Sequence, residues 1–241
     1  MDKIKLGVLV GGTSIEREVS KKSCENLLAN LDENKYDITV YHLPADGNTE
    51  WAKNIISNPP QIVLSALHGG NGENGSIQGF LHCLNIPYIG SKVLSSAICM
   101  NKAMAKTVMK ANHIQVPDHV FVMRGVDFSQ YEESIKLMGF PLIVKPNRGG
   151  SSIGVIVARN MEDIHYGIKN IMETYDDDVL IEKFIDGKEI NCCVLQGENG
   201  PEAMAVLDVK KAGSVFVYDD KYHIDEYSSD ITNLPDFMQD M

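Results

Sequence analysis

The sequence predicts an α/β protein that begins with a small doubly wound domain, a parallel sheet with helices on both faces. Short apolar runs alternate with helical segments over residues 1–90, a spacing typical of parallel α/β units. Further along, two β-branched segments flank a loop rich in glycine and serine, which predicts a β-hairpin. The composition, 44% hydrophobic and 23% charged residues in a chain of 241, is ordinary for a globular protein.

The first domain starts with the continuous apolar run Ile4–Val10, typical of a strand that is buried on both faces. A helix is expected to follow it through about Leu31, with Thr13 and Glu16 at the spacing of a capping box. The later predicted elements of this domain are a strand at Ile38–Leu43, a helix at Thr49–Ser57 and a strand at Ile62–Ala66.

The segment Pro87–Ser91 interrupts this alternation and marks a domain boundary. We therefore expect three domains, at residues 1–90, 91–181 and 182–241. The second and third domains contain these predicted elements, in chain order: a helix around Lys102, a strand at Asp118–Met123, a helix at Tyr131–Met138, the hairpin Leu142–Val157, a helix at Met161–Thr174, and strands at Val179–Ile185, Glu189–Leu195 and Ala203–Val209.

The charge and cysteine content exclude several classes of protein. The net charge of −11 gives no field that attracts nucleic acid or anionic lipid. The odd number of cysteines, five, and the absence of C-x-x-C spacing argue against a disulfide framework or a zinc site. No signal peptide precedes the first strand, and no apolar run approaches the roughly 18 residues of a membrane span. We expect a cytoplasmic protein without nucleic-acid or membrane partners.

Two polar loops follow strands of the first domain, where α/β sheets bind ligands. The loop Gly11–Glu16 lacks the G-x-G-x-x-G spacing, so we reject a dinucleotide site. Its charged run Glu16-Arg17-Glu18 could belong to a ligand site, and the alternative is that these charges merely complement the dipole of the following helix. His68, in the second loop, could equally be an ordinary hydrogen-bonded loop residue.

The hairpin loop has the residue types of a phosphate-binding site. Its glycines let backbone amides approach a ligand, the serines add hydroxyl groups, and Lys145 ends the first strand as a cation facing the loop. The alternative is a mobile surface hairpin without a ligand. The acidic run Asp176–Asp178 is interpreted as a solvated turn and not as a metal site.

Taken together, the motifs resemble those of D-alanine–D-alanine ligases of the ATP-grasp superfamily. They occur in the family's order across essentially the whole chain: Gly11–Ser20, Ala66–Gly69, Ile143–Pro146 with its Gly-Ser-Ser loop, Leu180–Phe184 and Lys221-Tyr222. The resemblance implies that an ATP-grasp fold of the α+β class follows the first domain. It also implies ligation of two D-alanines through an acyl phosphate, for peptidoglycan precursor synthesis.

The resemblance assigns ATP to the second and third domains. Lys102 and Lys145 match the lysines that hold the ATP phosphates, and Glu189 matches the contact to the ribose. The implied ATP-binding set comprises Lys102, Lys145, Gly150, Ser151, Ser152, Glu182, Lys183, Ile185 and Glu189.

The resemblance also implies a D-alanine site. Glu16 matches the carboxylate that pairs with the ammonium of the first D-alanine, and it is linked in the family to a serine and a tyrosine, here Ser151 and Tyr222. Val19 and His68 lie on the substrate side, and Lys221 matches a lid lysine that reaches the transferred phosphate. The implied catalytic residues are therefore Glu16, Ser151, Lys221 and Tyr222.

One departure from the family concerns magnesium. The family carries an arginine and then metal-binding carboxylates and an asparagine after its lid, and no such motif follows Tyr222. We therefore expect ATP and Mg²⁺ as cofactors but no metal ligand in this chain, and an ATP-grasp fold whose last part is incomplete. Two alternatives remain: a nucleotide-binding protein that has lost catalysis, and a ligase whose second substrate is D-serine. Tyr222 argues against D-lactate as the second substrate. The chain could also form a homodimer.

Overall fold

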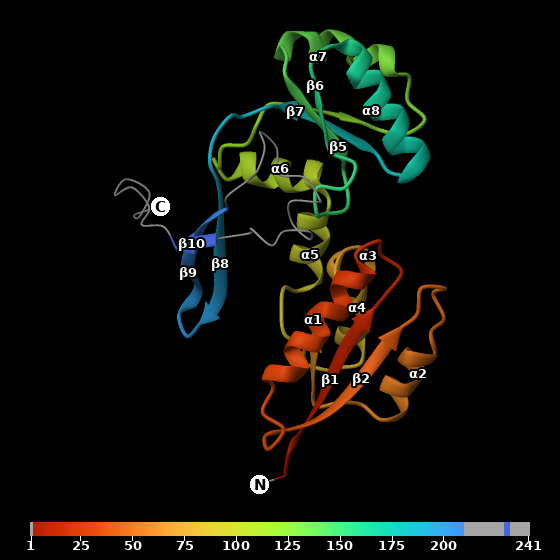
Figure 1. The fold of residues 1–241 in the computed structure, drawn as a ribbon, viewed down its shortest axis with the longest axis vertical. Helices are drawn as coiled ribbons and strands as arrows, with labels where there is room; N and C mark the ends of the chain where they lie inside the picture. The colour runs from red at the N-terminus through yellow and green to blue at the C-terminus, as the bar shows by residue number, and fades with distance from the viewer. Residues whose placement is uncertain (1, 210–228, 232–241) are drawn as a thin grey trace. The chain divides into compact units, whose positions relative to one another are not determined.

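The structure, a computed structural model, describes residues 2–209 and 229–231. The chain divides into two compact units. Unit 1 comprises Met1–Val116 and Asn147–Gly150, and unit 2 comprises Pro117–Pro146 and Ser151–Met241. Figure 1 shows the helices and strands of both units, which are described separately below. The predicted domain boundaries at residues 90 and 181 stay predictions.

Unit 1 is built on a parallel three-stranded sheet of order β2-β1-β3. Its strands are β1 (Ile4–Gly11), β2 (Tyr36–Leu43) and β3 (Ile62–Ser65). Both neighbours of β1 run parallel to it along their whole paired length. The prediction of a parallel sheet in this part of the chain is therefore confirmed.

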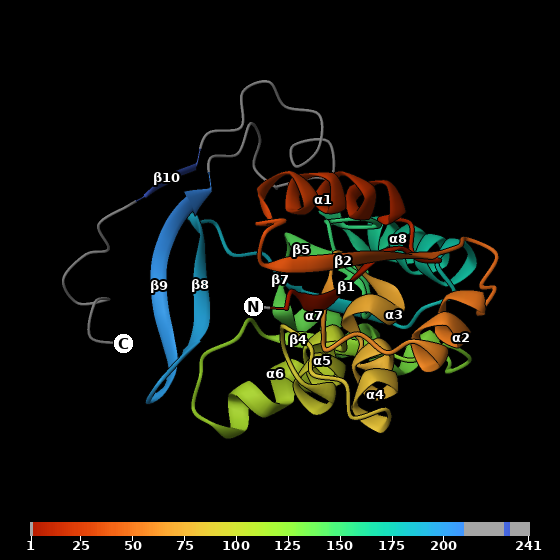
Figure 2. The ribbon, with the colours of Figure 1, turned by 90° about the horizontal axis from the view of Figure 1, so that it is seen from below.

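Helices cover both faces of this sheet, as Figure 2 shows. On one face α1 (Arg17–Asn30) packs against Val8 and its neighbours in β1. On the other face, α2 (Glu50–Ser57) and α4 (Ser76–Cys83) pack with Leu9. Successive residues of β1 point to opposite faces, so an uninterrupted apolar strand is needed to supply both cores.

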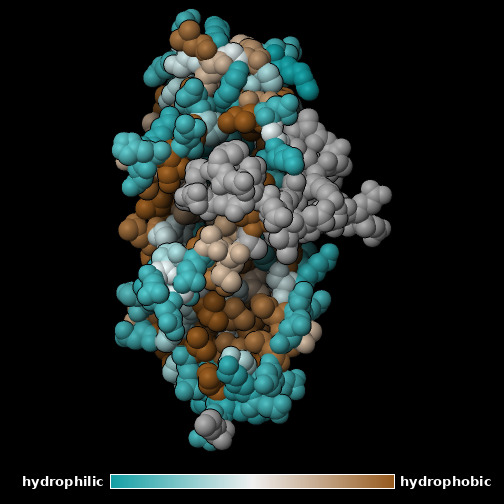
Figure 3. Space-filling model, turned by 90° about the vertical axis from the view of Figure 1, so that its left-hand side faces the viewer, coloured by the Kyte–Doolittle hydropathy of each residue, from teal (hydrophilic) through white to brown (hydrophobic). Residues whose placement is uncertain are grey.

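The helical part of unit 1 continues with α3 (Gly70–Glu73), α5 (Val93–Met100) and α6 (Lys102–Ala111). Large apolar side chains remain exposed on the last two helices, among them Leu94 at 72% and Met104 at 50%. Apolar residues coloured brown are visible on the surface in Figure 3. No residue of α6, which is fully described, is buried.

Unit 2 contains an antiparallel sheet of order β4-β7-β5-β6. These strands are β4 (His119–Val122), β5 (Leu142–Pro146), β6 (Ile156–Ala158) and β7 (Val179–Lys183). The predicted hairpin is confirmed, because β5 and β6 are antiparallel neighbours joined by the Gly-Ser loop.

The core of unit 2 lies between one face of this sheet and α8 (Met161–Thr174), with Val144 and Ile181 fully buried in it. The side chain of Asn160 caps α8 by accepting a hydrogen bond from the amide of Asp163 at 2.9 Å. A short 3₁₀ helix, η1 (Phe128–Tyr131), leads into α7 (Glu132–Met138).

The acidic run after α8 is a folded turn held by one arginine. The side chain of Arg124 pairs with Asp176, and its backbone amide donates to Asp178 Oδ1 at 3.0 Å. Asp177 is buried. The prediction of a solvated turn therefore holds for Asp176, which is exposed, but is wrong for Asp177, because the run closes against the segment that follows β4.

Three further strands form a separate antiparallel sheet: β8 (Glu189–Gly197), β9 (Gly200–Val209) and β10 (Ser229–Ile231). The long hairpin of β8 and β9 contains a register shift between Cys193 and Val194. Across the described residues, none of the helices combines the length and the apolar character that crossing a membrane requires.

Candidate active site

Glu16 is a buried carboxylate at the start of α1. Its side chain is 5% exposed and forms no capping hydrogen bond to the helix. Ser14 closes a separate turn ahead of the helix, because its Oγ accepts from the Glu16 amide at 3.1 Å and its carbonyl from the Arg17 amide at 3.1 Å. The helix therefore begins at Arg17, and the predicted capping box of Thr13 and Glu16 is wrong.

Two glycines of unit 1 lie beside the Glu16 carboxylate, and Gly69 leaves room for it. A Cβ atom on Gly69 would collide with Glu16 Oε2 and Ser14 Oγ. A Cβ atom on Gly150 would lie 3.7 Å from both carboxylate oxygens of Glu16. The carboxylate therefore lies beside both the loop that follows β3 and the start of the Gly-Ser loop.

His68 is held between two elements of unit 1. Its Nε2 lies 2.8 Å from Ser23 Oγ on α1, and its Nδ1 lies 3.9 Å from Glu73 Oε1 on α3. The hydrogen bond with Ser23 orients the imidazole ring, whereas the approach to Glu73 is too long for a hydrogen bond. His68 and Glu16 are also linked along the chain and in space, because Gly69, which faces the Glu16 carboxylate, follows His68 directly.

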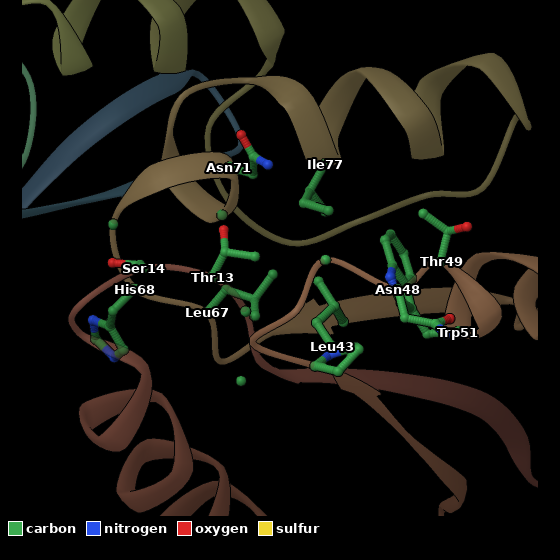
Figure 4. A pocket seen from close by; sticks show the side chains of 16 residues that line it. Thr13, Ser14, Leu43, Asn48, Thr49, Trp51, Leu67, His68, Asn71 and Ile77 are labelled. Atoms are coloured by element: carbon green, nitrogen blue, oxygen red, sulfur yellow. The ribbon is translucent and has the colours of Figure 1, made fainter. Parts of the chain in front are cut away.

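A cavity of about 130 Å³ opens beside these loops in unit 1 (Figure 4). The loops that follow β1, β2 and β3 all contribute to its wall, including Ser14, Asn48 and His68, and Trp51 of α2 completes it. None of the described residues that line it is an aspartate, glutamate, lysine or arginine. The cavity is therefore suited to neutral groups, whereas the carboxylate of Glu16 lies just outside its lining.

Lys102, the first residue of α6, contacts the start of the Gly-Ser loop within unit 1. Its Nζ donates to the carbonyl of Gly149 at 2.7 Å and lies 3.4 Å from the carbonyl of Asn147. The Gly149 amide in turn lies 3.4 Å from Met100 Sδ. The structure thus brings together Lys102 and the loop, two features that the sequence assigned to the same ligand.

In unit 2, Lys145 forms an ion pair with Glu182. The residues lie on the neighbouring strands β5 and β7, on the sheet face opposite the core residues Val144 and Ile181. Their side chains are 20% and 10% exposed, respectively. Two residues that were assigned to ATP binding therefore contact each other directly.

Lys183 has a structural contact that the sequence did not reveal. Its Nζ donates to the carbonyls of Met138 and Gly139 at 3.0 and 2.9 Å, at the carboxyl end of α7. Its side chain therefore ties β7 to that helix end. Ile185 is 64% exposed, and Glu189 is the first residue of β8.

The Gly-Ser loop has an unusual backbone. Ser151 and Ser152 have φ angles of 51° and 57°, and Gly149 and Gly154 have φ angles of 95° and 71°. Positive φ is uncommon for residues with a side chain and is concentrated at ligand-binding segments. Such a backbone can orient successive amides toward an anion.

The remaining predicted site residues lie elsewhere. Val19 is half-buried on α1. Lys221 and Tyr222 lie outside the described residues. Among the residues that are described, no group of three or more histidines, cysteines or carboxylates could hold a metal ion.

Comparison with known proteins identifies the family. Residues 49–91 match the family model described as D-ala D-ala ligase N-terminus, and residues 108–236 match the one described as D-ala D-ala ligase C-terminus. A D-alanine–D-alanine ligase of Bacillus anthracis is 37% identical over 233 residues, which are 96% of this chain and 73% of that protein. This chain belongs to the D-alanine–D-alanine ligase family.

Solved ligases of the family share the fold of this chain. The ATP complex of the D-alanine–D-alanine ligase from Bacillus anthracis superposes with a TM-score of 0.78 at 30% identity, covering 98% of this chain and 73% of that one. A D-Ala:D-Ser ligase from Enterococcus faecalis gives a TM-score of 0.76 at 28% identity, covering 95% and 76%. The predicted fold class, a parallel α/β domain followed by an ATP-grasp fold, is confirmed.

Three residues beside the ligase motifs were missed by the sequence analysis. Ser23 and Glu73 contact His68, and Asn147 contacts α6. For Ser23 a signal existed, because it follows Glu16 by two helical turns and so shares its face of α1. Asn147 lies inside a motif whose glycines, serines and lysine drew attention first.

Proposed function

We propose that this protein joins two D-alanine molecules at the expense of ATP. A carboxylate oxygen of the first D-alanine attacks the γ-phosphorus of ATP, and ADP leaves. The amine of the second D-alanine then attacks the carbonyl carbon of the acyl phosphate, loses a proton and expels inorganic phosphate. Family membership and the preserved motifs support this reaction, and the product serves peptidoglycan precursor synthesis in the cytoplasm.

The observation that carries the substrate assignment is the buried carboxylate of Glu16 beside two glycine-containing loops. A buried carboxylate attracts a cationic ligand strongly, because the interaction between two charges is screened less in a buried site than in water. The ammonium group of the first D-alanine is such a partner. His68 is proposed to lie on the substrate side, held by Ser23 and Glu73.

For ATP, we propose Lys102 and Lys145, the two lysines that the family resemblance assigns to the phosphates. Lys102 in unit 1 contacts the loop carbonyls, and Lys145 in unit 2 directly precedes Pro146 at the end of β5. Phosphoryl transfer depends chiefly on positioning and on neutralising the spread negative charge of the phosphates, which these ammonium groups supply. Glu182 and Lys183 of β7, together with Ile185 just after it, are proposed to contact the adenine.

Magnesium is a further expectation from the family. Among the described residues, no group of three or more histidines, cysteines or carboxylates would hold it. Lys221 and Tyr222 stay predictions, as does a homodimer.

The test compares two carboxylates at the start of α1. Glu16→Gln removes the buried charge, whereas Glu18→Gln removes an exposed one that pairs with Lys21. Each variant is assayed for phosphate release and for D-alanyl-D-alanine by mass spectrometry, with D-serine as an alternative second substrate. We expect a KM for the first D-alanine at least about tenfold higher in Glu16→Gln, and wild-type kinetics in Glu18→Gln.

The opposite results would contradict the proposal. If both variants keep wild-type kinetics and lose similar stability, Glu16 acts only on the helix dipole. If the wild-type protein consumes ATP only with D-serine as the second substrate, the second-substrate assignment is wrong.

A further inference from the structure

We propose that Asn147 is a positioning residue for ATP binding. It fixes the start of the Gly-Ser loop to the first turn of α6 and thereby determines the position of the Lys102 ammonium group. The inference deepens the proposed function of this loop and rests on it.

The first observation concerns the hydrogen-bond acceptors of the backbone amides at the amino end of α6. The first four amides of a helix have no partner within it. In α6, Lys102 and Ala103 donate to the carbonyl and Oδ1 of Asn147, both at 3.0 Å. The next two amides, of Met104 and Ala105, donate to Oδ1 and the carbonyl of Asn101, at 3.1 and 2.8 Å.

The Ala105 bond is the first i→i−4 bond of the helix itself, so of the three preceding amides Asn147 accepts two and Asn101 accepts one. Because free amides are what makes a helix end bind anions, this end offers a phosphate no amide of its own. What it offers is the ammonium group of Lys102.

The second observation is that Lys102 is anchored to the same loop at both ends. Its amide donates to the Asn147 carbonyl, and its Nζ donates to Gly149 at 2.7 Å and lies 3.4 Å from that same Asn147 carbonyl. A displacement of Asn147 would therefore move both the backbone and the ammonium group of Lys102. Asn101 makes no such contact with the loop among the hydrogen bonds of the described residues.

The third observation is the choice of side chain. Asn147 is fully buried, and its Nδ2 donor has no hydrogen-bond partner among the described residues. The amide proton of Ala103 identifies the other end of the side chain as the oxygen. Aspartate would cap the helix with oxygens alone, whereas asparagine brings a buried donor without a partner, and such a donor lowers stability. Capping alone therefore does not explain asparagine at this position.

The experiment compares Asn147→Ala with its matched control Asn101→Ala. Each variant removes one side-chain bond to the first turn of α6, so we expect similar decreases in melting temperature. ATP affinity is measured by calorimetry on the purified proteins. We expect the Kd for ATP to rise about tenfold in Asn147→Ala and to stay unchanged in Asn101→Ala. If Asn147→Ala does not fold, Asn147→Ser gives the same comparison, because its shorter side chain withdraws the acceptor from the Ala103 amide.

A double-mutant cycle tests whether Asn147 acts through Lys102. Lys102→Met should weaken ATP binding by about ten- to a hundred-fold, and adding Asn147→Ala should then have no further effect. If the two effects add, or if Asn147→Ala and Asn101→Ala bind ATP equally well, the positioning role is overturned while the proposed function stands. If the wild type does not bind ATP, or Lys102→Met binds it as tightly as wild type, the proposed function of the loop fails and the inference with it.

Discussion

Lys145 of β5 and Glu182 of β7 form an ion pair on the face of the unit 2 sheet that lies opposite its core. The sequence alone predicts that the Lys145 ammonium group binds the ATP phosphates and that replacing it leaves the fold intact. The pair gives it a second role. Removing one member of a buried ion pair takes away compensation for the other buried charge, which is destabilising.

We predict that Lys145→Met lowers the free energy of unfolding by about 3 kcal/mol and also weakens ATP binding. The double variant Lys145→Met/Glu182→Gln removes the unbalanced carboxylate and should regain a large part of that stability. Urea unfolding measures the first effect and calorimetry with ATP the second. An unchanged unfolding free energy in Lys145→Met would show that the pair contributes nothing to the fold.

Gly69→Ala should impair the D-alanine site of unit 1. Gly69 has a φ of 62°, and an added Cβ would collide with the Glu16 carboxylate and Ser14. We expect displacement of Glu16 and a KM for the first D-alanine raised by about tenfold. The control is Gly90→Ala, where φ is also positive, at 115°, but nothing lies within 4 Å of the new atom. Both variants should lose stability, and a raised KM in Gly90→Ala as well would contradict the assignment.

The sequence predicted those features that a short segment specifies by itself. The apolar run of β1 and the hairpin of β5 and β6 are examples, because each follows from a local pattern. The same holds for the burial of β1 on both faces, which an uninterrupted apolar strand implies.

Features that depend on distant residues could not be predicted in this way. The partner of Lys145 is 37 positions away and the partner of Lys102 is 47 positions away. Lys183 follows Glu182 directly but reaches α7 instead of the ion pair, because alternate residues of a strand face opposite sides. The order of the strands in the sheet decides which residues lie next to each face of β7, and a local sequence pattern does not specify that order.

Stability above pH 9 should depend on the thiol of Cys24. Burial raises the pKa of Cys24 above its ordinary value of 9.0, with Glu25 adding to the rise. The folded protein then holds the thiol neutral where the unfolded chain would ionise it. This contribution to stability is therefore complete below pH 9 and is lost as the pH rises through the folded-state pKa.

We predict that the unfolding free energy of the wild type falls more steeply between pH 8 and about pH 10 than that of Cys24→Ala. Cys83→Ala, which removes an exposed thiol of α4, should behave as wild type over the same range. Parallel pH profiles for wild type and Cys24→Ala would rule out this contribution.

Two glycines in the middle of helices should respond to alanine in opposite directions. Gly167 of α8 packs on the unit 2 sheet, and an added Cβ would lie 2.7 Å from Ile156 Cδ1 and 2.9 Å from Val144 Cγ1. Gly79 of α4 has no atom within 4 Å of that position. Replacing a helical glycine by alanine stabilises by up to about 1 kcal/mol, whereas overpacking a core costs about 1–3 kcal/mol.

Gly79→Ala should therefore raise the unfolding free energy by somewhat under about 1 kcal/mol. Gly167→Ala should lower it by about 1–2 kcal/mol, because both contacts come from buried or partly buried branched side chains that cannot swing away. Urea unfolding followed by circular dichroism gives both values from the same wild-type reference. If Gly167→Ala is as stable as Gly79→Ala, the packing of α8 on β5 and β6 is looser than the glycine contact indicates, and the core of unit 2 has room for a methyl group there.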